Sequence, residues 1–78
     1  MNSLQSRMAR AALKMGVRDI ALAAKVSTQT ITRLESGEEL KERTLDDIRR
    51  AYEEAGAKFI DDGEWVGTMV MKEPSANL

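Results

Sequence analysis

The sequence contains no cysteine and no histidine, and it has a single proline among its 78 residues. Without cysteine there is neither a disulfide nor a thiol nucleophile. Without histidine the chain lacks the commonest metal ligand and the usual acid–base group near neutral pH. A glycine-rich phosphate loop is also absent, and no enclosed pocket is expected at this size, so nothing in the sequence indicates a nucleophile–base set. We therefore expect neither an enzyme nor a bound metal or cofactor.

Long hydrophobic runs are also missing. No segment approaches the roughly 20 apolar residues of a membrane span, and the N-terminal stretch lacks the apolar run of a signal peptide. Hydrophobic residues make up 42% of the chain and charged residues 32%, which is ordinary for a small globular domain. The sequence thus predicts one small cytoplasmic domain without a membrane partner.

The net charge of −1 argues weakly against nucleic-acid binding until its distribution is considered. Residues 1–34 carry six basic and one acidic side chain, whereas residues 35–78 carry six basic and twelve acidic ones. Such asymmetry is typical of a protein with a phosphate-facing half and an acidic back. An uneven scatter of charge by chance is the alternative.

Apolar spacing and cap residues predict four helices, over residues 3–14, 17–25, 28–36 and from 42 or 44 to 55. Gly16 and Ser27 are expected as N-caps, and Asp19 lies in a first turn, where negative charge is favoured. Thr44 begins a possible capping box. Lys25 is expected in a left-handed conformation, which glycine would adopt at lower cost.

The core is expected along the apolar stripes of these helices. In the first helix the expected buried face consists of Leu4, Met8 or Ala9, Ala12 and Leu13. The later stripes are Ile20, Ala21 and Ala24; Ile31 and Leu34; and Leu45, Ile48, Ala51 or Tyr52, and Ala55.

After Gly56 the pattern becomes extended. Residues 58–61 and 66–72 read as two strands joined by a turn, with a flexible tail at 73–78. Two strands alone are marginal in water, so they need a surface to pack on or a partner strand, and pairing with a second copy is the expected solution. Trp65 either covers the core or packs in this dimer. The expected dimerisation residues are Phe59, Ile60, Trp65, Val66, Met69 and Val70.

The third predicted helix has two different faces. Ile31 and Leu34 are spaced to be buried together, which leaves hydrogen-bonding side chains without an acidic group on the outside: Thr28, Gln29, Thr32 and Arg33. A helix of this kind is suited to reading base edges in a major groove. A plain solvated helix face is the alternative.

Residues 7–35, RMARAALKMGVRDIALAAKVSTQTITRLE, resemble the helix-turn-helix domains of phage repressors and Cro proteins, the xenobiotic-response-element type of regulator. The likeness covers about residues 3–56; its most specific parts are Ala21, the run VSTQTITRLESG over 26–37, and Arg10. The resemblance implies a mainly α fold of four or five helices with a C-terminal β-hairpin or dimerising strands. Residues 1–56 would form the DNA-binding domain, with its motif at 17–37, and residues 57–72 a dimerising extension.

The resemblance also implies roles for individual residues. Thr28, Gln29, Thr32 and Arg33 occupy the base-reading positions, and Arg10 and Glu35 correspond to a salt bridge between the first and third helices. Val17 and Lys25 depart from the family pattern, which commonly has Gln and Gly there. Contacts to the DNA backbone would come from Gly16, Val17, Arg18, Ser27, Ser36, Lys41 and Arg43.

These expectations lead to two functional hypotheses. The first is a sequence-specific regulator of transcription that binds double-stranded DNA, associates with the nucleoid when bound, and represses as a homodimer on a palindromic operator. The alternative is the antitoxin of a toxin–antitoxin pair that also regulates its own operon, in which the acidic C-terminal half would hold the toxin.

Overall fold

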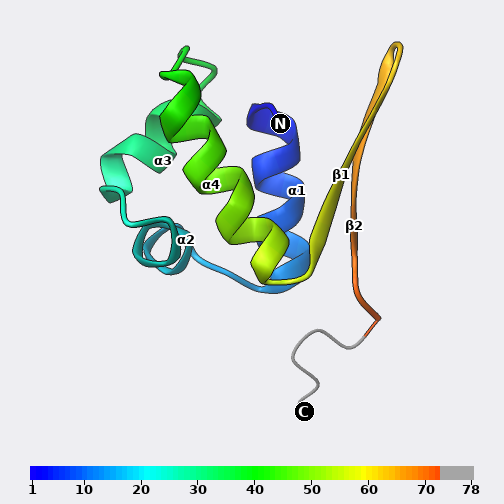
Figure 1. The fold of residues 1–78 in the computed structure, drawn as a ribbon, viewed down its shortest axis with the longest axis horizontal. Coiled ribbons are helices and arrows are strands. Elements are labelled where there is room, and N and C mark those ends of the chain that lie inside the picture. The colour runs from blue at the N-terminus through cyan, green and yellow to red at the C-terminus, as the bar shows by residue number, and fades with distance from the viewer. Residues whose placement is uncertain (73–78) are drawn as a thin grey trace.

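A computed structural model describes residues 1–72, and within them the chain forms four helices and one two-stranded antiparallel sheet (Figure 1). The fold is therefore mainly α, as the sequence predicts. The flexible tail expected at 73–78 lies outside the described residues. The elements are α1 (Ser3–Leu13), α2 (Val17–Ala24), α3 (Thr28–Glu35), α4 (Glu42–Glu54), β1 (Ala57–Asp62) and β2 (Trp65–Val70).

Helix starts follow from their caps. The Ser27 hydroxyl accepts from the amide of Thr30 at 3.1 Å at the start of α3, as expected. At α1 a capping box joins Asn2 and Gln5, each backbone amide donating to the other's side-chain oxygen. The capping box expected at Thr44 does not form. Lys41 is the N-cap of α4, so Thr44 already lies within the first helical turn.

Two lysines adopt the left-handed conformation. Lys25, where this was expected, has φ of 60°, and Lys14, where it was not, has φ of 58°. Each ends a helix: the amide of Val26 bonds the carbonyl of Ala21, and that of Met15 bonds the carbonyl of Arg10. These bonds close the last helical turn as glycine usually does, at the steric cost of a Cβ.

The core lies between the four helices, and α2 packs against both α3 and α4. Its fully covered members include Ile20, Ile31, Ile48 and Tyr52. The predicted buried face of α1 is partly wrong. Leu4 is 52% exposed and Ala12 is exposed, while Gln5 and Ser6 are buried beside Ala9. The apolar pattern of α1 gave the wrong face because Gln5 and Ser6 can be buried: both form hydrogen bonds to residues far away in the sequence.

The hairpin lies against α1 and the end of α4 (Figure 1). Phe59 and Val70 point inward, and the Phe59 ring meets Tyr52 edge-on with centroids 5.8 Å apart. Gln5 Nε2 donates to the carbonyl oxygens of Ile60 (2.8 Å) and Gly67 (2.9 Å), which are directly paired in the sheet. The side chain of Ile60 points away from the helices and Gly67 has none, so the inner face of the sheet is open at this pair of residues. The Gln5 amide occupies that space.

Replacing Lys25 with glycine is expected to raise the free energy of unfolding by about 1 kcal/mol, because the left-handed backbone then carries no Cβ. Urea denaturation followed by circular dichroism measures the change. Lys41→Gly is the matched control, since Lys41 has φ of −61° and gains no relief. Equal effects of the two substitutions would contradict this interpretation.

Candidate nucleic-acid interface

Helices α2 and α3 are joined by the short turn at 25–27, and the sides that face each other are buried. Ala21 is 3% exposed in α2, and Ile31 and Leu34 of α3 are 0% and 4% exposed. A small residue at Ala21 permits the close contact of the two helices. The opposite side of α3 is consequently turned to solvent, and its orientation is fixed by the core beneath it.

The outer face of α3 carries all four residues expected to read bases. Thr28, Gln29, Thr32 and Arg33 are exposed. Thr32 Oγ1 donates to the carbonyl of Thr28 at 3.1 Å, which occupies its proton within the helix. The Gln29 amide and the Arg33 guanidinium are the strongest hydrogen-bonding groups of this face.

Arg33 has a partner that the sequence analysis missed. Its Nε donates to Oε1 of Glu38 at 2.9 Å, and the two side chains remain 48% and 52% exposed. A basic residue in the last turn followed by an acid just after the terminal glycine is the sequence signal that could have indicated this pair.

The residues expected to contact the DNA backbone differ in exposure and in whether their polar groups already form hydrogen bonds. Gly16, Arg18, Ser27, Ser36, Lys41 and Arg43 are exposed. The Val17 side chain packs against the core, so only its backbone could meet a phosphate. The Ser36 hydroxyl donates to the carbonyl of Thr32 at 2.7 Å and the Ser27 hydroxyl caps α3.

The amide of Gly16 is occupied in the free protein. It donates to Oδ2 of Asp19 at 2.7 Å, which is the carboxylate expected in the first turn of α2. Helix N-termini bind phosphates through such amides. A phosphate at this place would therefore have to displace Asp19 or use neighbouring groups.

Glu35, the one acid in α3, points inward. Arg10 donates to both of its oxygens, from Nη2 to Oε1 at 2.7 Å and from Nε to Oε2 at 2.8 Å, and Ser6 Oγ donates to Oε2 at 2.6 Å. The Ser6 hydroxyl and the Tyr52 hydroxyl are 2.8 Å apart. Since the Ser6 proton points to the carboxylate, Tyr52 is the donor to Ser6. These four residues, the Glu35 network, join α1, α3 and α4.

The network perturbs the acidity of its members. Burial acts to raise the pKa of the Glu35 carboxyl, but the hydrogen bonds from Arg10 and Ser6 outweigh it and hold that pKa below its ordinary value. The hydrogen bonds that Arg10 donates to Glu35 raise the pKa of Arg10 against the effect of its own burial. Burial raises the pKa of the Tyr52 hydroxyl. The pair is thus charged and the tyrosine neutral at pH 7.

Ser6 and Tyr52 were not expected to take part in this network. Ser6 lies four residues before Arg10, so both occupy one face of α1. The four-residue spacing of Ser6 and Arg10 is the only signal in the sequence, and it does not indicate which residue they contact. The contacts span 29 residues to Glu35 and 46 residues to Tyr52, which no local pattern reveals.

The six residues expected to form a dimer divide between two faces of the hairpin. Phe59 and Val70 pack on the core and Val66 is half-buried on the same inner face. Ile60, Trp65 and Met69 are exposed on the other side, at 39%, 78% and 53%. Trp65 therefore does not cover the core of its own chain. We call the exposed residues Ile60, Trp65 and Met69 the outer hairpin face.

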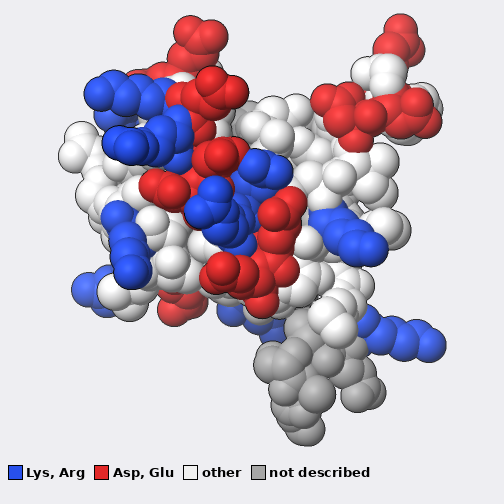
Figure 2. Space-filling view, viewed as in Figure 1, with Lys and Arg blue, Asp and Glu red and all other residues white. Residues whose placement is uncertain are grey.

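Charges are distributed unevenly over the surface (Figure 2). Over α4 basic and acidic groups are interleaved, and Arg49 forms ion pairs with Asp46 and Glu53. The turn between the strands is acidic, since Asp61, Asp62 and Glu64 are exposed there. Basic side chains gather over α3 and the start of α4, at the upper left of the view.

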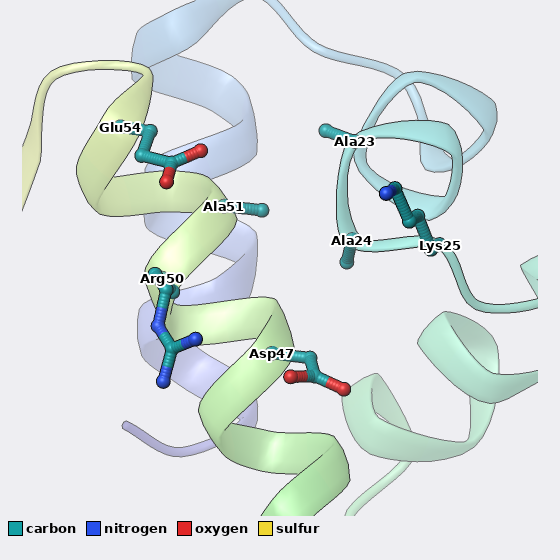
Figure 3. Close-up of a pocket in the computed structure, with 7 residues that line it drawn as sticks. All are labelled: Ala23, Ala24, Lys25, Asp47, Arg50, Ala51 and Glu54. Carbon is teal, nitrogen blue, oxygen red and sulfur yellow. The ribbon is translucent and has the colours of Figure 1, made fainter.

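A groove of about 290 Å³ lies on the surface where α2 and α4 meet (Figure 3). The methyl groups of Ala23, Ala24 and Ala51 face one another across it, and charged side chains stand around them: Lys25, Asp47, Arg50 and Glu54. No two of these charged residues form an ion pair in the part of the chain that the structure describes.

No family model matches the chain, and no curated protein matches its sequence. Within residues 1–72 no helix is long and apolar enough to cross a membrane. The same residues contain no cluster of three or more acidic side chains placed to hold a metal ion.

Glu35→Gln is expected to lower the free energy of unfolding by about 2 kcal/mol at pH 7, because a charge-assisted contact to half-buried Arg10 is lost. The folded pKa of Glu35 is lowered, so its contribution is complete above the unfolded pKa near 4.5 and disappears as pH falls through the folded pKa. The difference between the two proteins should therefore shrink below about pH 4.5.

Urea denaturation of both proteins from pH 7 to pH 2 measures this difference, and taking the difference cancels the titration of all other carboxylates. A difference that stays constant over the whole range would contradict the assignment. Arg49→Met, which removes exposed ion pairs only, serves as the control and should leave stability nearly unchanged.

Proposed function

We propose that this protein is a sequence-specific double-stranded-DNA-binding regulator of transcription, built on a helix-turn-helix at 17–37 within a DNA-binding domain at 1–56. The observation that carries the proposal is the outward face of α3. It presents Thr28, Gln29, Thr32 and Arg33, while the one acid of the helix is turned inward to Arg10. A carboxylate on this face of α3 would be repelled by the phosphates, and the inward orientation of Glu35 leaves the outer face of the helix itself without one.

Base recognition would depend on Gln29 and Arg33. A glutamine amide matches the N6 and N7 atoms of adenine, and a guanidinium matches O6 and N7 of guanine. Each such bidentate contact discriminates by about 1–3 kcal/mol. Thr28 and Thr32 lie beside them on the same exposed face and would add a methyl contact or a single hydrogen bond.

Contacts to phosphates would hold α3 in its groove. The exposed candidates are Arg18 at the start of α2 and Lys41 and Arg43 at the start of α4, with Gly16, Val17, Ser27 and Ser36 supplying backbone or hydroxyl groups. Such contacts set position and affinity but not sequence preference. Because cations are released from DNA on binding, affinity should fall steeply with salt.

A homodimer would place two α3 helices in successive major grooves, about 34–36 Å apart, on a palindromic operator. The outer hairpin face is the surface proposed for dimerisation, because it exposes large apolar side chains beside strand edges that are open in a two-stranded sheet. For such a dimer, occupancy of the operator, which blocks access of the polymerase, is the simplest mechanism of repression.

Arg33→Ala is expected to relax the preference at one base pair by about 1–3 kcal/mol, because a base contact is lost. Arg18→Ala should instead weaken binding to all sequences alike and reduce the salt slope by about one. Selection of bound fragments from random DNA identifies the site, and fluorescence anisotropy on site variants measures both effects. Equal affinity of the wild-type protein for selected and scrambled DNA would contradict the proposed function.

Trp65→Ala is expected to weaken self-association by about 2 kcal/mol, because an exposed aromatic anchor is removed from the dimer. Sedimentation equilibrium measures the effect. Leu22→Ala is the control, since Leu22 is 79% exposed on α2, away from the hairpin. A wild-type protein that stays monomeric at concentrations that saturate its DNA site would refute this role of the hairpin.

The alternative function is that of an antitoxin that also regulates its own operon. The same outer hairpin face favours it, because a large apolar surface suits a protein partner as well as a second copy. Co-purification of a second protein with the chain expressed from its native operon would support this function. A stable homodimer with no such partner would exclude it.

A further inference from the structure

We propose that Glu38 is a positioning residue for base reading: it holds Arg33 by Nε and leaves the two terminal amino groups of the guanidinium free for a base. This inference rests on the proposed function. It concerns a residue outside α3 that neither the motif nor the outer-face pattern of the helix indicates.

The end of α3 places Glu38 beside Arg33. Gly37 has φ of 91°, and its amide bonds the carbonyl of Leu34 at 3.0 Å, while the amide of Glu38 bonds the carbonyl of Arg33 at 3.1 Å. These two bonds form a Schellman motif, which reverses the chain at the end of the helix. The backbone of Glu38 is therefore fixed against Arg33 before its side chain makes any contact.

The side-chain contact uses one particular edge of the guanidinium. Nε of Arg33 donates to Oε1 of Glu38 at 2.9 Å. Arginine carries five N–H donors in a planar fork, and the edge formed by its two terminal nitrogens is the one that meets O6 and N7 of guanine end-on. Holding Nε thus fixes the plane and direction of the fork without occupying that edge.

The pair is half-exposed in the free protein, so it orders Arg33 only weakly there. Water leaves the surface when DNA covers it, and hydrogen bonds between charged groups strengthen as the local dielectric falls. The carboxylate also opposes nearby phosphates, which lowers affinity for any DNA. We therefore expect Glu38 to increase discrimination between base pairs while it lowers the overall affinity for DNA.

Glu38→Ala tests the proposal, with Glu39→Ala as the matched control. Glu39 is an exposed acid in the same loop and forms no ion pair within residues 1–72. Fluorescence anisotropy with the full chain compares the selected DNA site with versions in which the base pair read by Arg33 is changed. Glu38→Ala should reduce discrimination at that base pair at least about fivefold, and Glu39→Ala should leave it unchanged.

Two further variants separate positioning from charge. Glu38→Gln keeps an oxygen that can accept from Nε but has no charge, so it should retain more discrimination than Glu38→Ala. In an Arg33→Ala background, Glu38→Ala should cause no further loss of discrimination, because its effect passes through Arg33.

Unchanged or increased discrimination in Glu38→Ala would overturn the proposal, because it would mean that the carboxylate merely competes with DNA for Arg33. Equal effects of Glu38→Ala and Glu39→Ala would overturn it as well, since charge alone would then explain both. A wild-type protein without sequence preference overturns the proposed function together with this inference, whereas a selective wild-type protein with an equally selective Glu38→Ala overturns the inference alone.

Discussion

The Glu35 carboxylate is the group on which the arrangement of the helices depends. It accepts two hydrogen bonds from Arg10 of α1 and one from Ser6, and Ser6 in turn is bonded to Tyr52 of α4. A carboxylate with an 11% exposed side chain is stable only with such partners. The same contacts turn the acid of α3 away from solvent, so one network both joins three helices and determines the charge of the outer α3 face.

Helix α1 connects this network with the hairpin. Ser6 and Arg10 bind Glu35 on one side, and Gln5 binds the carbonyls of Ile60 and Gly67 on the other. A two-stranded hairpin is marginal by itself, so its stability depends on this amide and on the contact between Phe59 and Tyr52. A polar side chain thus attaches the sheet to the helices together with apolar packing.

Local signals in the sequence were sufficient for the helices and the hairpin. Ser27, Asp19 and the turn at Gly63 act through neighbours within a few residues, and helix and strand bounds followed closely. The predicted buried face of α1 was partly wrong because Gln5 and Ser6 are stabilised by groups 29 to 62 residues away. The pair of Arg33 with Glu38 was missed for another reason. It depends on the left-handed turn at Gly37, which brings Glu38 back beside the last turn of α3, so the two residues become neighbours only once that turn is taken into account.

The proposed dimer gives these connections a functional consequence. If two copies associate through the outer hairpin face, the position of one α3 relative to the other is transmitted through the contacts of the hairpin with Gln5 and those of α1 with Glu35. Hydrogen bonds with defined geometry fix orientation more tightly than apolar contact alone, because apolar packing is non-directional. The spacing between two half-sites would then depend on residues that touch neither DNA nor the partner subunit. Under the proposed function, the buried polar groups of α1 would thus contribute to recognition together with the exposed side chains of α3.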